Sequence, residues 1–273
     1  MRNRILLLIV FLPLSSAASA QGLRVSTVVY DAGSLNEAGQ EPIVSTGFSL
    51  FHNGRVYDYV ESAEEVVVFS PVDHRFTVLN EHRRVYTTID FREVDRLLEA
   101  RIPKTEEYLR ELTARGVPDA ERAGRILQFQ LSPQFESTYD SKRGLLKLTS
   151  PSWKYTVSTR EWDDEEQLEK YLTFADWTAR LNYVLHPSAM FPEPRLALNE
   201  ELRKRKLRIP VVVQLDLRPD ERRVLRAEHQ FIRKLTDQDR QLISRWDGLL
   251  RNSELKQLPF RGYQEAQLMS HTR

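Results

Sequence analysis

Apolar and polar residues alternate with a period of two along the front of the chain, a pattern typical of half-buried strands. Leu23, Val25, Thr27 and Val29 share one face, and strand-like runs follow at 43–52, 55–60, 66–69, 76–79 and 85–89. Asn53-Gly54 lies between two of these runs, and both residues tolerate the positive φ of a type I′ hairpin turn. Turns are also expected at 71–74 and 80–83, so the pattern predicts a meander of about six strands.

The spacing of apolar residues becomes helical after residue 89. Asp90 and Glu93 have the spacing of a capping box, and one helix is expected up to Pro103 and a second up to Gly116. Strands are expected again at 126–129, 135–139, 145–149 and 155–157, with a turn at 142–144. We expect a single domain over 21–273, and 116–124 is the one place where it could divide.

The longest predicted helix starts at the acidic run 163–166, which suits the positive end of a helix dipole, and ends before His186-Pro187. A basic helix over 196–206 follows, and 209–213 is expected to pair with 224–231. Thr236 and Asp239 are expected to cap a last helix that carries apolar residues between 242 and 250. Together the elements predict an α+β fold, in which a curved antiparallel β-sheet (a half-barrel-like meander) packs with several α-helices.

Residues 1–20 have the three-part layout of a secretory signal peptide. Arg2 and Arg4 precede an apolar run over 5–14, and Ala18-Ser19-Ala20 is a small-residue cleavage site. We therefore expect cleavage after Ala20 and a soluble mature protein that is periplasmic or secreted. No later stretch approaches the ~18 apolar residues of a spanning helix, so no transmembrane segment is expected in the mature chain.

Composition narrows the function further. The chain has no cysteine, which excludes disulfides, thiol nucleophiles and cysteine metal sites. Loss of the leader lowers Lys and Arg from 40 to 38 against 39 Asp and Glu, a net charge of −1. A net charge near zero argues against nucleic acid as a partner, because proteins that bind nucleic acids usually have a large excess of basic residues. The sequence has no His-Glu-x-x-His, Gly-x-Ser-x-Gly or glycine-rich phosphate-loop motif, and no metal or cofactor is expected.

One dense basic cluster is a candidate electrostatic contact. On an anionic lipid surface each of its cations could contribute about 1 kcal/mol. The alternative is that these cations end a helix favourably and extend into solvent. The cluster consists of Arg203, Lys204, Arg205, Lys206 and Arg208.

Glu228, His229 and Asp239 are a candidate carboxylate–histidine group for acid–base chemistry. Neighbouring residues in a strand point to opposite faces, however, which favours a structural role for His229.

Aromatic side chains are the candidate ligand contacts. Most aromatic residues belong to a core, but a curved sheet with an incompletely filled interior would leave them around an apolar cavity. In that case the ligand would contact Tyr57, Tyr59, Phe69, Phe76 and Trp177.

The strand rhythm from Asn53 to Ile89 resembles that of the periplasmic lipoprotein carriers. It consists of the runs 53–59, 66–69, 76–79 and 84–89, which pass into a helix. In that family a curved antiparallel half-barrel wraps over helices around an apolar cavity, so the resemblance implies a non-catalytic carrier of an apolar or lipid-like ligand. The alternatives are an envelope scaffold that binds other envelope proteins around a packed interior and, more weakly, a hydrolase using Glu228, His229 and Asp239.

We predict that Gln21 is the first residue of the exported protein, because the small-residue site ends at Ala20. N-terminal sequencing of protein recovered from the periplasm after expression of the full chain checks this, and a retained leader would contradict it.

Overall fold

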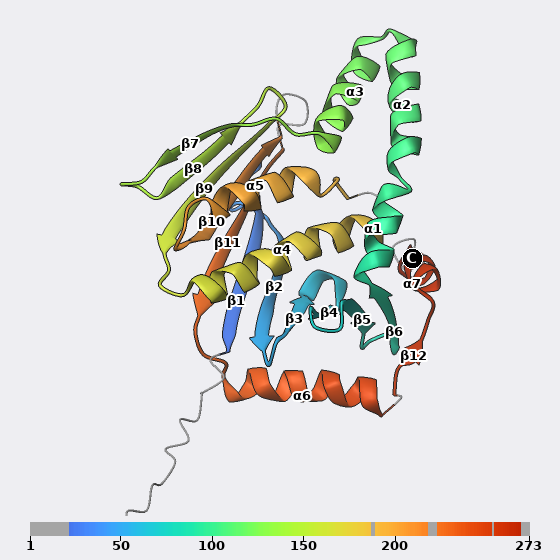
Figure 1. The fold of residues 1–273 in the computed structure, drawn as a ribbon, viewed down its shortest axis with the longest axis vertical. Coiled ribbons are helices and arrows are strands. Elements are labelled where there is room, and N and C mark those ends of the chain that lie inside the picture. The colour runs from blue at the N-terminus through green and yellow to red at the C-terminus, as the bar shows by residue number, and fades with distance from the viewer. Residues whose placement is uncertain (1–21, 187–188, 218–222, 253, 269–273) are drawn as a thin grey trace, which may run out of the picture.

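The computed structural model describes residues 22–186, 189–217, 223–252 and 254–268 (Figure 1). The predicted leader and its cleavage site lie outside the described residues. Within them the chain forms one open, curved sheet of 12 strands that packs with helices on both faces. This is the α+β class that the sequence predicts.

The strands pair in the order β12-β6-β5-β4-β3-β2-β1-β11-β10-β9-β8-β7. Neighbours are antiparallel, except that β12 is parallel to β6. The first strand lies between β2 and β11, so it joins a front meander, β1 to β6, to a rear meander, β7 to β11. The strands are β1 Leu23–Asp31, β2 Ile43–His52, β3 Arg55–Val60, β4 Glu65–Ser70, β5 Arg75–Asn80, β6 Val85–Asp90, β7 Glu136–Asp140, β8 Leu145–Thr149, β9 Trp153–Glu161, β10 Arg208–Leu217, β11 Arg223–Ile232 and β12 Lys256–Gln257.

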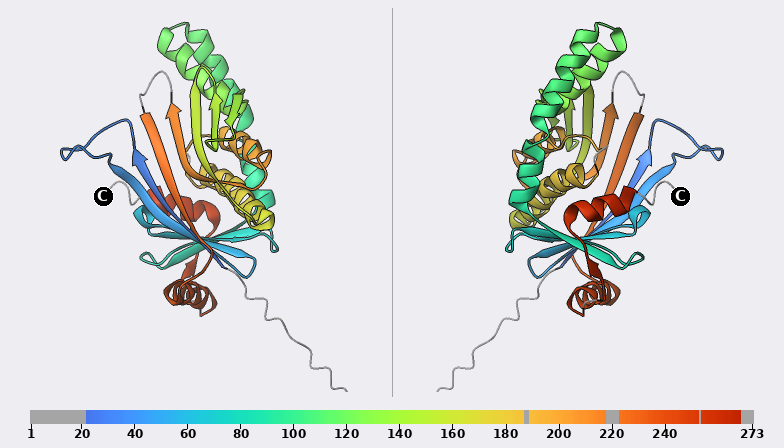
Figure 2. Two further views of the ribbon diagram at one scale, coloured as in Figure 1. Left: turned by 90° about the vertical axis from the view of Figure 1, so that its left-hand side faces the viewer. Right: turned by 90° about the vertical axis from the view of Figure 1, so that its right-hand side faces the viewer.

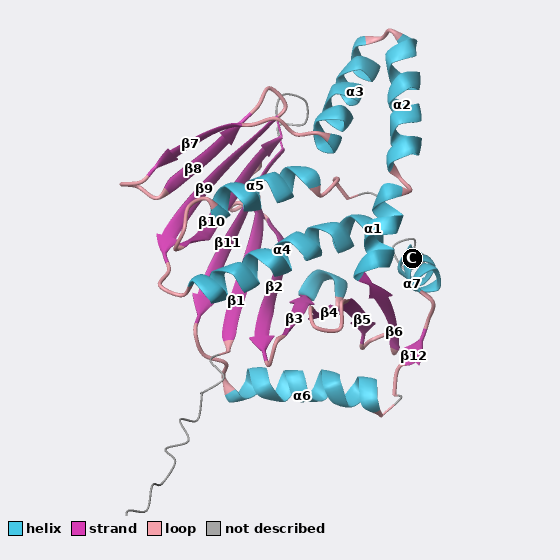
Figure 3. Ribbon diagram, viewed as in Figure 1, coloured by secondary structure: helices cyan, strands magenta, loops and turns pink. Residues whose placement is uncertain are grey.

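Helices cover both faces of this sheet (Figure 3). We call the face that contacts α4 the inner face and the face that contacts α6 the outer face. Val56 of β3 packs in one cluster with Phe174 of α4, whereas the next residue, Tyr57, packs with Trp246 of α6. The helices are α1 Phe91–Glu99, α2 Ile102–Arg115, α3 Pro118–Leu131, α4 Glu165–Leu185, α5 Glu193–Arg203, α6 Asp237–Arg251 and α7 Phe260–Leu268, with a short 3₁₀ turn at Glu61–Ala63.

The predicted hairpins are confirmed. Asn53 and Gly54 have φ values of 48° and 74°, as a type I′ turn requires. Gly144, in the turn between β7 and β8, has a φ of 61°. The predicted pairing of 209–213 with 224–231 is also present, because Val213 lies opposite Ala227 in the β10–β11 ladder.

The predicted strand at 126–129 is wrong, since these residues belong to α3. Pro118 occupies the first turn of that helix and Asp119 and Glu121 suit its positive end, so the helix starts well before the apolar run. Ala120 and Gly124 are buried residues of α3, which contacts α2 along its length. A short apolar run has no periodicity of its own, and here the neighbouring helix decides its conformation.

The α2–α3 hairpin extends away from the sheet (Figure 2). The possible domain boundary at 116–124 covers the loop between α2 and α3 and the first half of α3. Strands before and after this segment nevertheless belong to one sheet, and α4 contributes residues to the apolar clusters of both meanders. None of the described helices is both long and apolar enough to cross a membrane.

A capping box starts α6, as predicted. The backbone N–H of Asp239 donates to Thr236 Oγ1 at 3.1 Å, and the backbone N–H of Thr236 donates to Asp239 Oδ2 at 2.9 Å. Asp239 also forms an ion pair with Arg24 of β1, so the cap ties α6 to the central strand. A further helix, α7, which the sequence pattern did not indicate, follows α6.

We predict that Thr236→Ala lowers the free energy of unfolding by about 1 kcal/mol, because it removes the side-chain acceptor of the cap. Urea denaturation measures the change. Ser244→Ala is the matched control, since its exposed hydroxyl donates only to a helix carbonyl, that of Arg240. An equal effect of the two substitutions would contradict the prediction.

Candidate ligand-binding cavity

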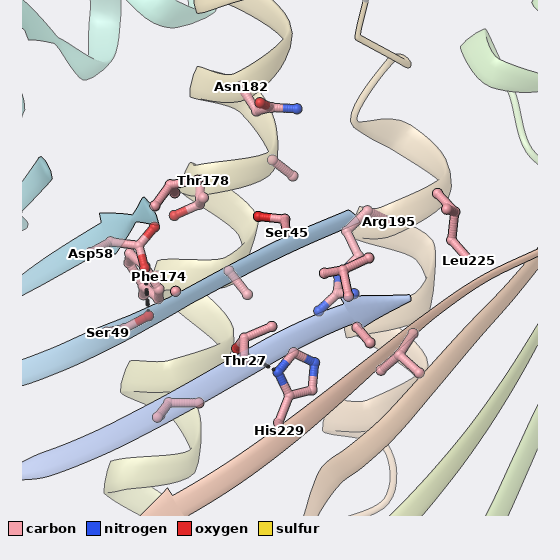
Figure 4. Close-up of a pocket in the computed structure, with 18 of the residues that line it drawn as sticks. Thr27, Ser45, Ser49, Asp58, Phe174, Thr178, Asn182, Arg195, Leu225 and His229 are labelled. Carbon is pink, nitrogen blue, oxygen red and sulfur yellow. Dashed lines mark hydrogen bonds between the residues drawn. The ribbon is translucent and has the colours of Figure 1, made fainter. Parts of the chain in front are cut away.

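A cavity of about 460 Å³ lies between the inner face of the central strands and helices α4 and α5 (Figure 4). Its volume is within the range of about 300–1,000 Å³ that is common for small-molecule sites. A second hollow of about 640 Å³ lies near the start of α4, among hairpin turns and charged residues that include Asp164, Glu166, Glu169 and Lys170. We therefore take the first cavity, which lies in the middle of the fold, as the candidate site.

Strand alternation explains which residues line the cavity. Successive side chains of a strand point to opposite faces, so every second residue of the central strands faces α4. The β1–β11 register places Thr27 opposite His229 and Val29 opposite Ala227. The residues contributed in this way are Val25, Thr27 and Val29 of β1, Ser45, Gly47 and Ser49 of β2, Val213 and Leu215 of β10, and Leu225, Ala227 and His229 of β11.

Small side chains account for the hollow. Ala175, Thr178 and Ala179 of α4 line the cavity, and their i, i+3 and i+4 spacing puts them on one side of the helix. Gly47 and Ala227 line it from the sheet. Larger residues surround them, so the two layers are held apart where the small residues face each other and the space between them stays open.

Asp58 is a carboxylate at this apolar site. It lies opposite Ser49 in the β2–β3 ladder, and the Ser49 hydroxyl donates to its Oδ1 atom at 2.6 Å. Burial raises the pKa of Asp58 from 3.8 to about 6, and the hydrogen bond from Ser49 opposes that rise. No ion pair of Asp58 is found within the described residues.

His229 is a neutral imidazole with one unused nitrogen. Its Nδ1 atom lies 2.9 Å from Thr27 Oγ1, whereas Nε2 is buried and has no hydrogen-bond partner among the described residues. Burial, and to a smaller extent the nearby Arg195, lower the pKa of His229 from 6.5 to about 3. The ring is therefore uncharged at neutral pH. Thr178 Oγ1, on α4, is a second buried atom without a partner.

Arg195 is the cation of the cavity. It lies in the first turn of α5 and is half-buried. Its charge opposes the burial-driven rise in the pKa of Tyr155 and Tyr171, so its guanidinium is close to both hydroxyls and to His229. In the part of the chain that the structure describes, no carboxylate forms an ion pair with Arg195.

The aromatic residues proposed from the sequence do not line one cavity. Tyr57 lies on the outer face, where it stacks on Trp246 and donates to Asp247. Phe69 and Phe76 are buried on the inner face, and Trp177 stacks against α1. Tyr59 alone borders the candidate cavity, and its ring also packs against Trp246.

The basic cluster is matched by acidic side chains. Arg203 pairs with Asp176 at 2.7 Å, and Lys204 and Arg205 share Glu201. Lys206 lies 3.9 Å from Glu165, and Arg208 lies 3.2 Å from Glu161. The predicted basic helix starts earlier than expected, at Glu193, and ends at Arg203, so most of the cluster lies beyond it. Contact of these residues with an anionic lipid surface stays a prediction.

The three residues of the hydrolase hypothesis are not brought together. Glu228 forms an ion pair with Arg226, and its strand neighbour His229 faces the cavity. Asp239 forms the capping box of α6 with Thr236, and α6 packs on the outer face of the sheet. Among the described residues no group of three or more His, Asp or Glu side chains could hold a metal ion.

Sequence reasoning raised the possibility of an apolar cavity under the curved sheet, but it missed the position of the cavity and did not single out Asp58 or Arg195. A signal existed in the small residues Ala175, Thr178 and Ala179, which interrupt the apolar face of the long helix at helical spacing. No family model matches this chain, and no curated protein is similar enough to be matched with it.

We predict that Asp58→Asn stabilises the protein by about 3 kcal/mol at pH 8 and has little effect at pH 4. The folded state prefers protonated Asp58, so stability is highest below the unfolded pKa of 3.8 and falls as pH rises through the folded value of about 6. Asparagine removes the buried charge and keeps an acceptor for Ser49.

Urea denaturation of both proteins at the two pH values measures this difference. Asp73→Asn, in an exposed turn, is the control and should change stability by less than about 0.5 kcal/mol. A stabilisation by Asp58→Asn that is the same at pH 4 and pH 8 would show that burial of the charge is not its cause.

Proposed function

We propose that this protein is a non-catalytic, exported binding or carrier protein for an apolar or lipid-like ligand, and that the ligand occupies the cavity under α4. The observation that carries the proposal is the 460 Å³ space in the middle of the fold, lined mainly by apolar side chains. An apolar wall that faces water costs free energy, and an apolar ligand that covers this wall would recover part of that cost.

The construction of the cavity supports binding rather than accidental poor packing. Small residues line the cavity from both the helix and the sheet, namely Ala175 and Ala179 of α4 and Ala227 of β11. The surface of the wall is mainly apolar although the lining includes polar side chains such as Ser45, Thr178 and Asn182, a combination that suits binding sites for small molecules. An acyl chain or a similar apolar group fits these requirements.

The scaffold alternative receives less support. A scaffold with a fully packed interior has no use for an internal cavity. Its binding face should also be a contiguous exposed apolar patch. The large exposed apolar residues of the described chain are instead distributed over several parts of the fold, which include β2 with Ile43 and Val44, α2 with Ile102 and Tyr108, and the β4–β5 turn with Val72. Binding of partner proteins through the α2–α3 hairpin remains a separate question from what the cavity holds.

We predict that Ala179→Trp weakens binding of the neutral fluorescent probe N-phenyl-1-naphthylamine by about tenfold or more, because the indole enters the cavity from α4. A tenfold increase in the dissociation constant corresponds to a loss of about 1.4 kcal/mol of binding free energy. Fluorescence titration measures the affinity.

Ala114→Trp, at an exposed position of α2, is the matched control and should bind the probe as the unchanged protein does. Ala227→Leu fills the same cavity from the sheet with a smaller group, in case the first variant is unstable. Absence of probe binding by the unchanged protein, together with no apolar molecule in native mass spectra of protein purified from its own envelope, would refute the proposal.

A further inference from the structure

We propose that the ligand is a long-chain fatty acid, whose carboxylate is bound by Arg195 and by Nε2 of His229 at one end of the cavity. This inference rests on the proposed function and adds the chemical class of the headgroup. It depends on two side chains of the cavity wall. Nε2 of His229 has no hydrogen-bond partner among the described residues, and Arg195 has no carboxylate partner among them.

The position of Arg195 is not explained by the fold. It lies in the first turn of α5, where the helix dipole is positive and a cation is unfavourable. The neighbouring arginines on this side of the molecule have carboxylate partners: Arg203 pairs with Asp176, Arg205 with Glu201 and Arg208 with Glu161. Among the described residues Arg195 has no carboxylate partner. It forms a hydrogen bond with the hydroxyl of Tyr171, a neutral group that leaves the guanidinium charge unpaired and able to bind an anion inside the cavity.

His229 supplies the second contact. If the Thr27 hydroxyl donates to Nδ1, the neutral ring carries its proton on Nε2, the buried atom without a partner. A buried donor that makes no hydrogen bond lowers stability, and a carboxylate oxygen would remove that cost by accepting the bond. Figure 4 shows the Arg195 side chain extending from α5 toward His229, so both groups can reach one headgroup.

The other charged group of the cavity wall lies elsewhere. Figure 4 shows Asp58 on the opposite side of the view, next to Ser49 and the Phe174 side of α4. Asp58 is not among the groups that shift the pKa of His229, whereas Arg195 is. Tyr171 lies between the two charged groups, because the charges of both Arg195 and Asp58 affect its pKa, whereas Tyr155 is affected by Arg195 alone. The positive charge of the cavity wall therefore lies at the end with Arg195 and His229.

Size and geometry favour a single-chain carboxylate. A cavity of about 460 Å³ is near the lower end of the usual range for ligand sites, which suits one acyl chain better than two. The two oxygens of a carboxylate match the fork of a guanidinium, and a third hydrogen bond from Nε2 is compatible with that pairing.

A ligand series with one chain length tests the headgroup without any mutation. Palmitate, methyl palmitate, hexadecyl phosphate and palmitylamine are titrated, below micelle formation, as competitors of N-phenyl-1-naphthylamine. We expect palmitate to bind about tenfold or more tightly than its methyl ester, since an Arg–carboxylate contact in an apolar site exceeds 1.4 kcal/mol. Tighter binding of the phosphate or the amine, or equal binding of palmitate and its ester, overturns the assignment.

Variants identify the residues responsible. Arg195→Leu should weaken binding of palmitate much more than binding of methyl palmitate, because only the acid loses a charge partner, and Arg195→Lys should restore part of the preference. Arg92→Leu, at an exposed position of α1, is the matched control. In addition, palmitate should raise the pKa of His229 measured by NMR above its ligand-free value of about 3, because an adjacent anion favours the charged ring.

The two proposals fail in different ways. If the probe and methyl palmitate bind but the carboxylate has no advantage, the cavity binds apolar ligands and only the headgroup assignment is wrong. If the probe and all four competitors fail to bind, the proposed function itself is wrong.

Discussion

The structure depends on the pairing of the first strand along both of its edges. β1 pairs with β2, its neighbour in sequence, and with β11, which lies about two hundred residues later, and so turns two meanders into one sheet. The register places Thr27 between Gly47 and His229. A slip of one residue would send the Thr27 side chain to the outer face, because strand side chains alternate. The cavity wall therefore exists only in this register.

Buried polar groups have two different roles in this protein. Glu65, whose pKa burial raises to about 7, accepts hydrogen bonds from Tyr263 at 2.9 Å and from Gln267 at 2.7 Å. Its bonds hold α7 against β4, which is a structural role. His229 Nε2 and Thr178 Oγ1, by contrast, are buried at the cavity and left without partners in the described structure. Unsatisfied groups of this kind lower stability. These two line the apolar cavity, where a ligand could supply the missing hydrogen bonds.

Local elements of the fold could be predicted because local chemistry determines them. The hairpin turn at Asn53-Gly54 depends on the backbone preferences of these two residues. The cap of α6 depends on hydrogen bonds between Thr236 and Asp239, which are three residues apart. The segment 126–129 was assigned wrongly because an apolar run of that length suits a strand or a helix, and contact with α2 decides between them. The candidate aromatics failed as a set for a similar reason, since strand parity puts Tyr57 and Phe69 on opposite faces of the sheet.

The sequence by itself determined the class of the fold, the hairpins of the front meander, the approximate extents of α1, α2, α4 and α6, and the mainly aromatic and aliphatic character of the interior. These features follow from periodicity and turn chemistry, which act over a few residues. Only the tertiary structure decided that β1 lies between β2 and β11, that small residues of α4 face small residues of the sheet, and that Arg195 lies close to His229. Those contacts join residues far apart in the chain, and a pattern read along one segment carries no information about the element that will pack against it.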